Sequence, residues 1–232
     1  ALTFGELDRL AHRVACGLYH FGLRTGDVMS LQLPNWAEWL VVHAALSKLG
    51  AVTNSIGAMY RQKEVSYILD YAGSKMLILP DVYRRFAHAD MAGALWPDLP
   101  ALEQIFVIGE DVPEGMRSHR ELFDYPWEEE VSEARIAECR PDPDSVVTLM
   151  FTSGTTADPK GVMHTHNTLG CGTRQVATLF DFGPDEVIFM PSPIGHTTAL
   201  LVGARVPLQY GLTTVWQEHW DAEQAVELIE EH

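Results

Sequence analysis

Small polar residues and one lysine form a short block in the middle of the chain, at residues 152–160. The hydroxyl side chains of this block are Thr152, Ser153, Thr155 and Thr156. Hydroxyls can donate to phosphate oxygens, Gly154 allows backbone N–H groups to approach an anion, and Lys160 adds a positive point charge. The block therefore has the composition of a phosphate-binding loop. Composition alone also fits an ordinary polar turn, because Ser, Thr, Gly, Asp and Pro are the usual turn residues.

Two well-known phosphate-binding sequences do not match the block. A Walker A loop requires G-x-x-x-x-G-K-[ST], but here Lys160 follows Pro159 and precedes Gly161. A dinucleotide fingerprint requires G-x-G-x-x-G at the start of a helix. The block has the single glycine Gly154, and the segment after it has an extended pattern. We therefore exclude both classes.

Strand patterns flank the block on both sides. Residues 146–151 are apolar and rich in β-branched side chains, which is typical of a strand, and residues 161–164 form a second short extended stretch. The sequence predicts a strand, a polar loop at its tip, and a returning strand.

Strand and helix patterns alternate through the rest of the chain. We expect strands at residues 28–33, 51–54, 76–79, 104–108, 187–190 and 212–215. We expect helices from the Thr3 capping box to Gly22, from Asn35 (capped with Glu38) to Leu49, at 62–72, 82–95 and 167–180, at 198–210 with an interruption at Pro207, and after an Asp221 cap. This order predicts an α/β fold with open, largely parallel sheets, helices on both faces, and ligands at the carboxyl ends of the strands.

Residues 109–143 interrupt the alternation. This polar segment contains Glu128, Glu129 and Glu130, and we expect a surface excursion with one short helix near 128–139. Phe123, Tyr125 and Trp127 favour burial, so a domain boundary is an option here but a flexible linker is not.

The charge balance excludes one class of partner. Lys and Arg number 16 and Asp and Glu number 32, giving a net charge of −16, so we expect no nucleic-acid binding. A polyphosphate would have to be held by a local positive site against this overall charge.

Cysteine, histidine and hydropathy patterns indicate the compartment and bear on metal binding and membrane insertion. Cys16, Cys139 and Cys171 are widely spaced with no C-x-x-C, which favours a reducing compartment, and we expect the cytoplasm. His164 and His166 have no third ligand nearby, so we expect no metal site within the chain. No run of about 18 apolar residues is present, so no transmembrane helix is expected.

The order of the residues in the central block resembles a known signature. Residues 151–161, FTSGTT-x-x-PKG, resemble the phosphate loop of the adenylate-forming (AMP-binding) superfamily, which includes acyl-CoA synthetases, peptide-synthetase adenylation domains and luciferases. Residues 2–7 (LTFGEL), 46–52 (LSKLGAV) and 191–196 (PSPIGH) resemble further segments of that family. The pattern is most similar to acyl-CoA ligases for fatty, alicyclic or aromatic acids.

The resemblance implies a two-step reaction. A carboxylate attacks the α-phosphate of ATP to give acyl-AMP and pyrophosphate, and the thiol of CoA then takes the acyl group. It implies ATP, Mg²⁺ and CoA as cofactors or co-substrates and a small carboxylic acid as partner, and it leaves a homodimer as an option. It implies nucleotide binding by Thr152, Ser153, Gly154, Thr155, Thr156, Lys160 and Gly161, and catalytic roles for Lys160 and His196. His196 would lie near the adenine or the carboxylate, and the alternative is a capping or packing histidine.

The chain departs from the family pattern in two ways. Alanine stands at Ala157, where the family usually has glycine, and a left-handed backbone there would cost about 1–2 kcal/mol. The family's later glutamate, aspartate and lysine motifs are absent, so we expect a truncated N-terminal domain at residues 1–232 that is inactive alone. A domain that loads a carrier protein and a non-catalytic nucleotide-binding remnant remain alternatives.

Overall fold

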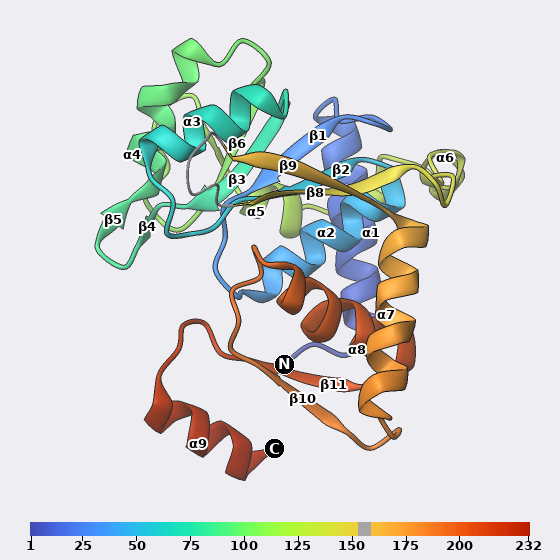
Figure 1. Cartoon of the computed structure of the whole chain (residues 1–232). Helices are drawn as coiled ribbons and strands as arrows, with labels where there is room; N and C mark the ends of the chain where they lie inside the picture. Colours follow the sequence, from blue (N-terminus) through green and yellow to red (C-terminus); the bar gives the residue numbers. More distant parts are fainter. Residues whose placement is uncertain (153–158) are drawn as a thin grey trace.

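One large sheet organises most of the chain, in a computed structural model that describes residues 1–152 and 159–232 (Figure 1). Its strand order is β7-β6-β3-β1-β2-β8-β9. The strands are β1 (Val28–Leu31), β2 (Val52–Ser55), β3 (Met76–Pro80), β6 (Gln104–Ile108), β7 (Arg117–Ser118), β8 (Val146–Thr152) and β9 (Lys160–Thr165). All neighbouring pairs are parallel except β8 and β9. The predicted α/β class with a largely parallel sheet is confirmed.

Helices cover both faces of this sheet, as expected. They are α1 (Phe4–His20) and α2 (Ala37–Leu49) on one face, and α3 (Gln62–Tyr71) and α4 (His88–Leu95) on the other. Strand β3 shows the division, because Met76 and Ile78 pack in the core with α1 and α2, whereas Leu77 and Leu79 pack with α3 and α4. Successive side chains of a strand point to opposite faces, so a strand buried on both sides reads as a continuous apolar run.

The first helix begins at the capping box that its sequence predicts. The Thr3 hydroxyl accepts from the Glu6 amide at 3.2 Å, and the Glu6 carboxylate accepts from the Thr3 amide at 2.8 Å. These reciprocal bonds satisfy two amides that a helix start otherwise leaves free. The helix ends at His20, and Gly22 then adopts a φ of 100° that suits glycine.

A second, smaller sheet pairs β10 (Val187–Met190) with β11 (Thr213–Trp216) in parallel. Helix α7 (His166–Phe180) runs from the end of β9 down to this sheet (Figure 1). Between β10 and β11 lie a π-helical segment, η3 (Ala199–Arg205), and α8 (Val206–Tyr210). Pro207 lies in the first turn of α8, where its missing N–H is tolerated, so the helix expected at 198–210 divides into two segments.

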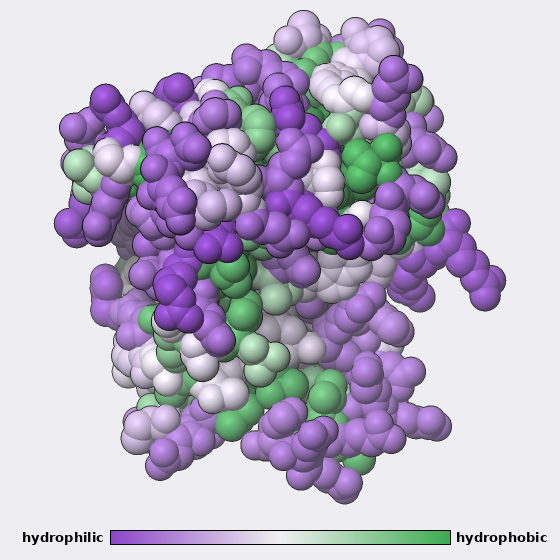
Figure 2. Space-filling model, turned by 180° about the vertical axis from the view of Figure 1, so that it is seen from behind, coloured by the Kyte–Doolittle hydropathy of each residue, from purple (hydrophilic) through white to green (hydrophobic). Residues whose placement is uncertain are grey.

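The last helix, α9 (Ala222–Glu231), has the predicted cap. The Asp221 carboxylate accepts from the Gln224 amide at 3.0 Å. Figure 2 shows a mostly hydrophilic surface with apolar side chains gathered in its lower half, the level of the second sheet and α9 in Figure 1. Trp220, Val226 and Ile229 are exposed apolar residues of this region.

The helix predicted at 82–95 is wrong in its first part. Residues 82–87 form a hairpin of β4 (Val82–Tyr83) and β5 (Phe86–Ala87), and α4 begins at His88. Arg84 and Arg85 form its turn with φ of 48° and 65°. A two-residue hairpin turn of type I′ has positive φ at both positions, and the usual Asn-Gly signal for it is missing from this sequence.

The segment at 109–143 has more structure than the single short helix expected. It contains β7, α5 (Arg120–Phe123), the 3₁₀ turn η2 (Trp127–Glu129) and α6 (Glu133–Glu138), and a further 3₁₀ turn, η1 (Trp96–Asp98), follows α4. Trp127 and Ile136 are buried in the main core, whereas Tyr125 is exposed, contrary to expectation. A domain boundary in this segment stays a prediction.

In the part of the chain that the structure describes, no helix has the length and apolar character needed to cross a membrane.

Candidate functional site

The β8–β9 hairpin places three of the predicted phosphate-binding residues, Thr152, Lys160 and Gly161, at one end of the large sheet. The antiparallel register pairs Thr152 with Lys160 and Phe151 with Gly161, which confirms the predicted strand–loop–strand arrangement with slightly longer strands. Thr152 and Lys160 are exposed, so both side chains are accessible to a ligand. The expected ligands Ser153, Gly154, Thr155 and Thr156, and the unusual Ala157, lie outside the described residues.

Gly161 has a packing reason of its own. A Cβ atom at this position would lie 3.0 Å from Leu149 Cδ1 and 3.4 Å from Phe151 Cζ. The first separation is shorter than ordinary van der Waals contact, so a side chain at this position would require Leu149 to shift. The glycine keeps the two strands of the hairpin close where the loop begins.

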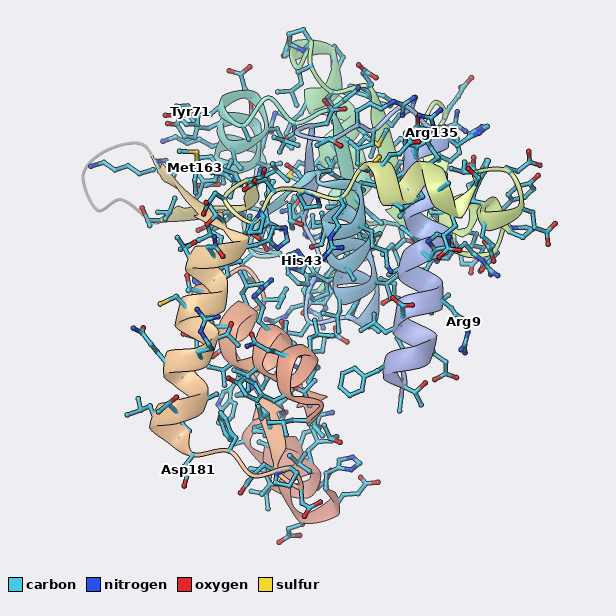
Figure 3. All side chains as sticks on the ribbon, turned by 90° about the vertical axis from the view of Figure 1, so that its right-hand side faces the viewer. Arg9, His43, Tyr71, Arg135, Met163 and Asp181 are labelled. Atoms are coloured by element: carbon cyan, nitrogen blue, oxygen red, sulfur yellow. The ribbon has the colours of Figure 1, made fainter. Side chains whose placement is uncertain are left out.

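Aromatic residues of α3 support the base of the hairpin. The Tyr67 hydroxyl donates to the Pro159 carbonyl at 3.3 Å, and the Phe151 ring meets those of Tyr67 and Tyr71 edge-on, with centroids 6.5 Å and 5.9 Å apart. Figure 3 shows Tyr71 and Met163 at the same end of the molecule. Sequence reasoning missed this support, although two tyrosines four residues apart on a helix share one face.

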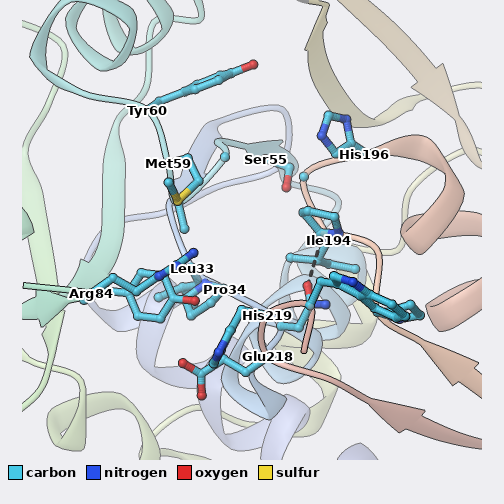
Figure 4. Close-up of a pocket in the computed structure, with 18 of the residues that line it drawn as sticks. Leu33, Pro34, Ser55, Met59, Tyr60, Arg84, Ile194, His196, Glu218 and His219 are labelled. Carbon is cyan, nitrogen blue, oxygen red and sulfur yellow. Dashed lines mark hydrogen bonds between the residues drawn. The ribbon is translucent and has the colours of Figure 1, made fainter. Parts of the chain in front are cut away.

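A cavity of about 240 Å³ lies at the carboxyl ends of the parallel strands (Figure 4). Its walls come from residues 33–35, 55, 57–60, 83–84, 151, 191, 193–196 and 218–220. The chain leaves β1 for α2 on one face of the sheet and leaves β2 for α3 on the other. Such a change of face opens a crevice at the strand ends, where open α/β sheets bind ligands.

His196 is the predicted site residue that lines this cavity. It closes the turn at 191–196, where its amide donates to the Pro193 carbonyl at 3.0 Å, and its side chain is exposed. The His196 carbonyl accepts from the Leu200 amide at 3.1 Å, so His196 stands at the start of the helical residues that lead into η3, with its side chain exposed. Its role toward a ligand stays a prediction. Phe151, which pairs with Gly161, lines the same cavity and connects it to the hairpin.

Ser55 is a cavity residue that sequence reasoning missed. It ends β2, is only 5% exposed, and its hydroxyl has no hydrogen-bond partner among the described residues. Figure 4 shows this hydroxyl facing the space between His196 and Ile194. A buried hydroxyl without a partner costs free energy, which a ligand in the cavity would recover. The sequence offered no signal beyond a serine at the end of a strand.

The expected role of Asn35 as a helix cap is wrong. Trp36 directly precedes α2, and no side chain bonds to the first turn of the helix. The Asn35 amide instead points to the second sheet, where it bonds to the backbone of Ser192, Ile194 and Gln217. The Asn35 side chain bonds to a residue 159 positions away in sequence instead of to the first turn of α2. The local sequence looks the same for a helix cap and for such a distant contact, so it could not tell them apart.

Ionisable side chains also line the cavity. Arg84, Glu218 and His219 line it, and none of them forms an ion pair within the described residues. Burial raises the pKa of the Tyr83 phenol, and the Glu218 carboxylate raises it further, so this hydroxyl stays protonated at neutral pH. The His88 Nδ1 and Nε2 atoms lie 3.0 Å from the Phe86 and Ala58 carbonyl oxygens respectively, so this side chain lies between the Arg84 hairpin and the cavity wall.

The described residues contain no group of three or more His, Cys, Asp or Glu side chains that could hold a metal ion. Mg²⁺ in nucleotide sites keeps several waters and needs only one or two carboxylates besides the phosphates. A magnesium ion that is bound mainly by the phosphates of a nucleotide would need no such cluster of side chains.

Known proteins are similar to this chain in sequence and in fold. The model of the AMP-binding enzyme family matches residues 1–232. A medium-chain fatty-acid–CoA ligase of Escherichia coli (strain K12) is 29% identical over 99% of this chain and 40% of its own length. A salicyl-AMP ligase / salicyl-S-ArCP synthetase of Mycobacterium tuberculosis (strain ATCC 25618 / H37Rv) is 29% identical over 100% of this chain and 40% of its own.

A solved structure agrees with these relatives. ATP-bound MatB from Rhodopseudomonas palustris superimposes with a TM-score of 0.80 and 26% identity, over 98% of this chain and 42% of that one. The chain thus spans about 40% of the length of the curated relatives it matches. The fold and the hairpin beside the cavity are consistent with the family match over residues 1–232. The chain belongs to the AMP-binding enzyme family.

Proposed function

We propose that this chain is the N-terminal part of an AMP-forming acid–thiol ligase. The protein would activate a fatty, alicyclic or aromatic carboxylic acid with ATP to acyl-AMP and pyrophosphate, and then transfer the acyl group to CoA. The observation that carries the proposal is the position of the β8–β9 hairpin, whose Phe151 lines a cavity at the carboxyl ends of the sheet and whose Thr152 and Lys160 flank the phosphate-loop sequence. The relatives with this architecture include a CoA ligase and an AMP ligase.

The hairpin residues would act by position and charge. Thr152 and the loop residues Ser153, Gly154, Thr155 and Thr156 would bind the β- and γ-phosphates, and Lys160 would offset their negative charge. Phosphoryl transfer needs little covalent work from a protein, so orientation and electrostatic stabilisation carry most of the catalysis. Mg²⁺ would enter with ATP and neutralise phosphate charge.

The cavity would hold the reacting carboxylate beside His196. This side chain is exposed and lines the cavity, so one ring nitrogen can donate to a carboxylate or adenylate oxygen. The hydroxyl of Ser55 would give a second polar contact in a largely apolar space.

Two neighbouring arginines beside the cavity, Arg84 and Arg85, favour CoA as the acyl acceptor. Arg84 lines the cavity, Arg85 follows it in the hairpin turn, and both have exposed side chains with no ion pair among the described residues. In a chain of net charge −16, such a pair makes a local positive site suited to phosphate groups. The salicyl-AMP relative, whose name includes a carrier-protein synthetase, supports carrier loading as the second candidate.

The first experiment is carboxylate-dependent exchange of labelled pyrophosphate into ATP by the full protein, with a panel of fatty, alicyclic and aromatic acids. We expect exchange with one class of acid, and in Lys160→Ala we expect exchange that is much slower at the ATP and pyrophosphate concentrations that saturate wild type. The matched control is Arg9→Ala, an exposed basic residue of α1 that Figure 3 shows on the opposite side of the molecule from Met163 of β9. Absence of exchange with every acid would refute the proposal. Thioester formed with CoA but not with a carrier protein would decide between the two candidates.

A further inference from the structure

One buried amide joins the two sheets at the cavity. Asn35 is only 8% exposed and follows β1 by way of Pro34. Its Nδ2 donates to the Ser192 carbonyl and to the Gln217 carbonyl, each at 2.9 Å, and its Oδ1 accepts from the Ile194 amide at 2.8 Å. Both donors of the side chain are thus used, and the bonds join segments more than 150 residues apart in sequence.

The partners of Asn35 belong to two walls of the cavity. Ser192 and Ile194 lie in the turn that carries His196, and Gln217 directly precedes the wall residues 218–220. Gln217 is itself buried, and its side chain donates to the Asp221 carbonyl at 2.8 Å. The Asn35 side chain, in the connection after β1, therefore bonds to both cavity walls that follow the strands of the second sheet.

The chemistry of this joint requires an amide. Two backbone carbonyls converge on Nδ2 and need donors, while the Ile194 amide needs an acceptor. Aspartate has nearly the same shape but would bring a carboxylate oxygen against both carbonyls, and alanine would leave three buried backbone groups without partners. An ordinary helix cap would not need this combination, and Asn35 does not cap α2.

We propose that Asn35 is a positioning residue for the reaction: it sets where His196 and the wall at 218–220 stand relative to the ends of β1 and β2. Asn35 itself lines the cavity, but its Nδ2 hydrogens and its Oδ1 are taken by backbone groups, so it acts through the Pro191–His196 turn and the backbone of Gln217. This inference rests on the proposed function, because it assigns the cavity to the acid.

The KM values for the acid and for ATP should respond differently to a change at Asn35. The hairpin joins the large sheet through β8, which pairs with β2, so its position does not depend on the joint at Asn35. In Asn35→Asp of the full protein we expect KM for the acid to rise about tenfold or more, with KM for ATP within about twofold of wild type. The control is Asn167→Asp, an exposed asparagine whose Nδ2 donates to Asp144 at 2.7 Å.

Amide hydrogen exchange tests the joint without activity. We expect the Ile194 amide to exchange about tenfold faster in Asn35→Asp and in Asn35→Ala, while the Ile56 amide, bonded to the Leu31 carbonyl within the first sheet, keeps its rate. An equal rise in both KM values, or a wild-type acid KM in Asn35→Asp, would overturn the inference. If wild type itself shows no acid-dependent exchange of pyrophosphate, the proposed function fails instead.

Discussion

His43 provides a test of the core through its pH dependence. This residue of α2 is buried, its Nδ1 lies 2.8 Å from the Thr53 hydroxyl, and its ring stacks on Trp39 with centroids 4.9 Å apart. Burial is the main cause that lowers the pKa of His43 from 6.5 to about 3, and repulsion from Arg205 and His166 also lowers it. The folded protein therefore keeps this imidazole neutral at a pH where the unfolded chain protonates it.

The sign and size of the effect follow from proton linkage. Below pH 6.5 the unfolded chain binds a proton that the folded chain does not, so the free energy of unfolding falls as the pH falls. Between pH 7.5 and pH 5 the pKa values of 6.5 and about 3 correspond to a loss of about 2 kcal/mol from this one group. The stability contributed by this group is complete above pH 6.5 and declines as the pH falls from 6.5 to about 3.

The measurement is urea unfolding followed by tryptophan fluorescence at pH 7.5 and at pH 5, in wild type and in His43→Asn. Asparagine can keep a bond to Thr53 but does not titrate. The variant should be less stable at pH 7.5, because it loses the contact with Trp39, yet its loss between the two pH values should be about 2 kcal/mol smaller than that of wild type. His88 and His166, whose pKa values are also lowered by burial, contribute equally to both proteins. Equal pH-dependent losses would refute the reasoning.

Three further predictions concern the phosphate loop and the core. Lys160→Ala should raise KM for ATP or pyrophosphate about 10- to 100-fold with little change in melting temperature, because the side chain is exposed; a steady-state titration measures this. Ala157→Gly should tighten ATP binding in the full protein, and calorimetry that shows unchanged or weaker affinity would contradict it. Gly17→Ala should destabilise the protein by about 1–3 kcal/mol in chemical denaturation, because its Cβ would lie 2.6 Å from the Trp127 ring.

The sequence predicted those parts of the fold that depend on local pattern. The Thr3 and Asp221 caps and the apolar strands around the loop are readable because each signal lies within a few residues. The β4–β5 hairpin was missed because Arg84 and Arg85 occupy a turn that usually takes Asn and Gly. Strand β7 has only two residues, too few for any periodic pattern.

The candidate site was predicted only in part, for a similar reason. The phosphate loop is one continuous sequence, and the turn with His196 is another, so each could be recognised alone. Their relation to each other depends on the strand order and on Asn35, whose partners are distant in sequence. The Ser55 hydroxyl has meaning only once the cavity around it is known.

Transfer of an oxygen atom tests the central proposal most directly. If a carboxylate attacks the α-phosphate of ATP, one carboxylate oxygen stays on AMP when the thiol displaces the acyl group. The full protein, given ATP, CoA and an ¹⁸O-labelled carboxylic acid, should release AMP that carries ¹⁸O, together with pyrophosphate and the acyl thioester. Unlabelled AMP, or ADP and phosphate in place of AMP and pyrophosphate, would contradict the account.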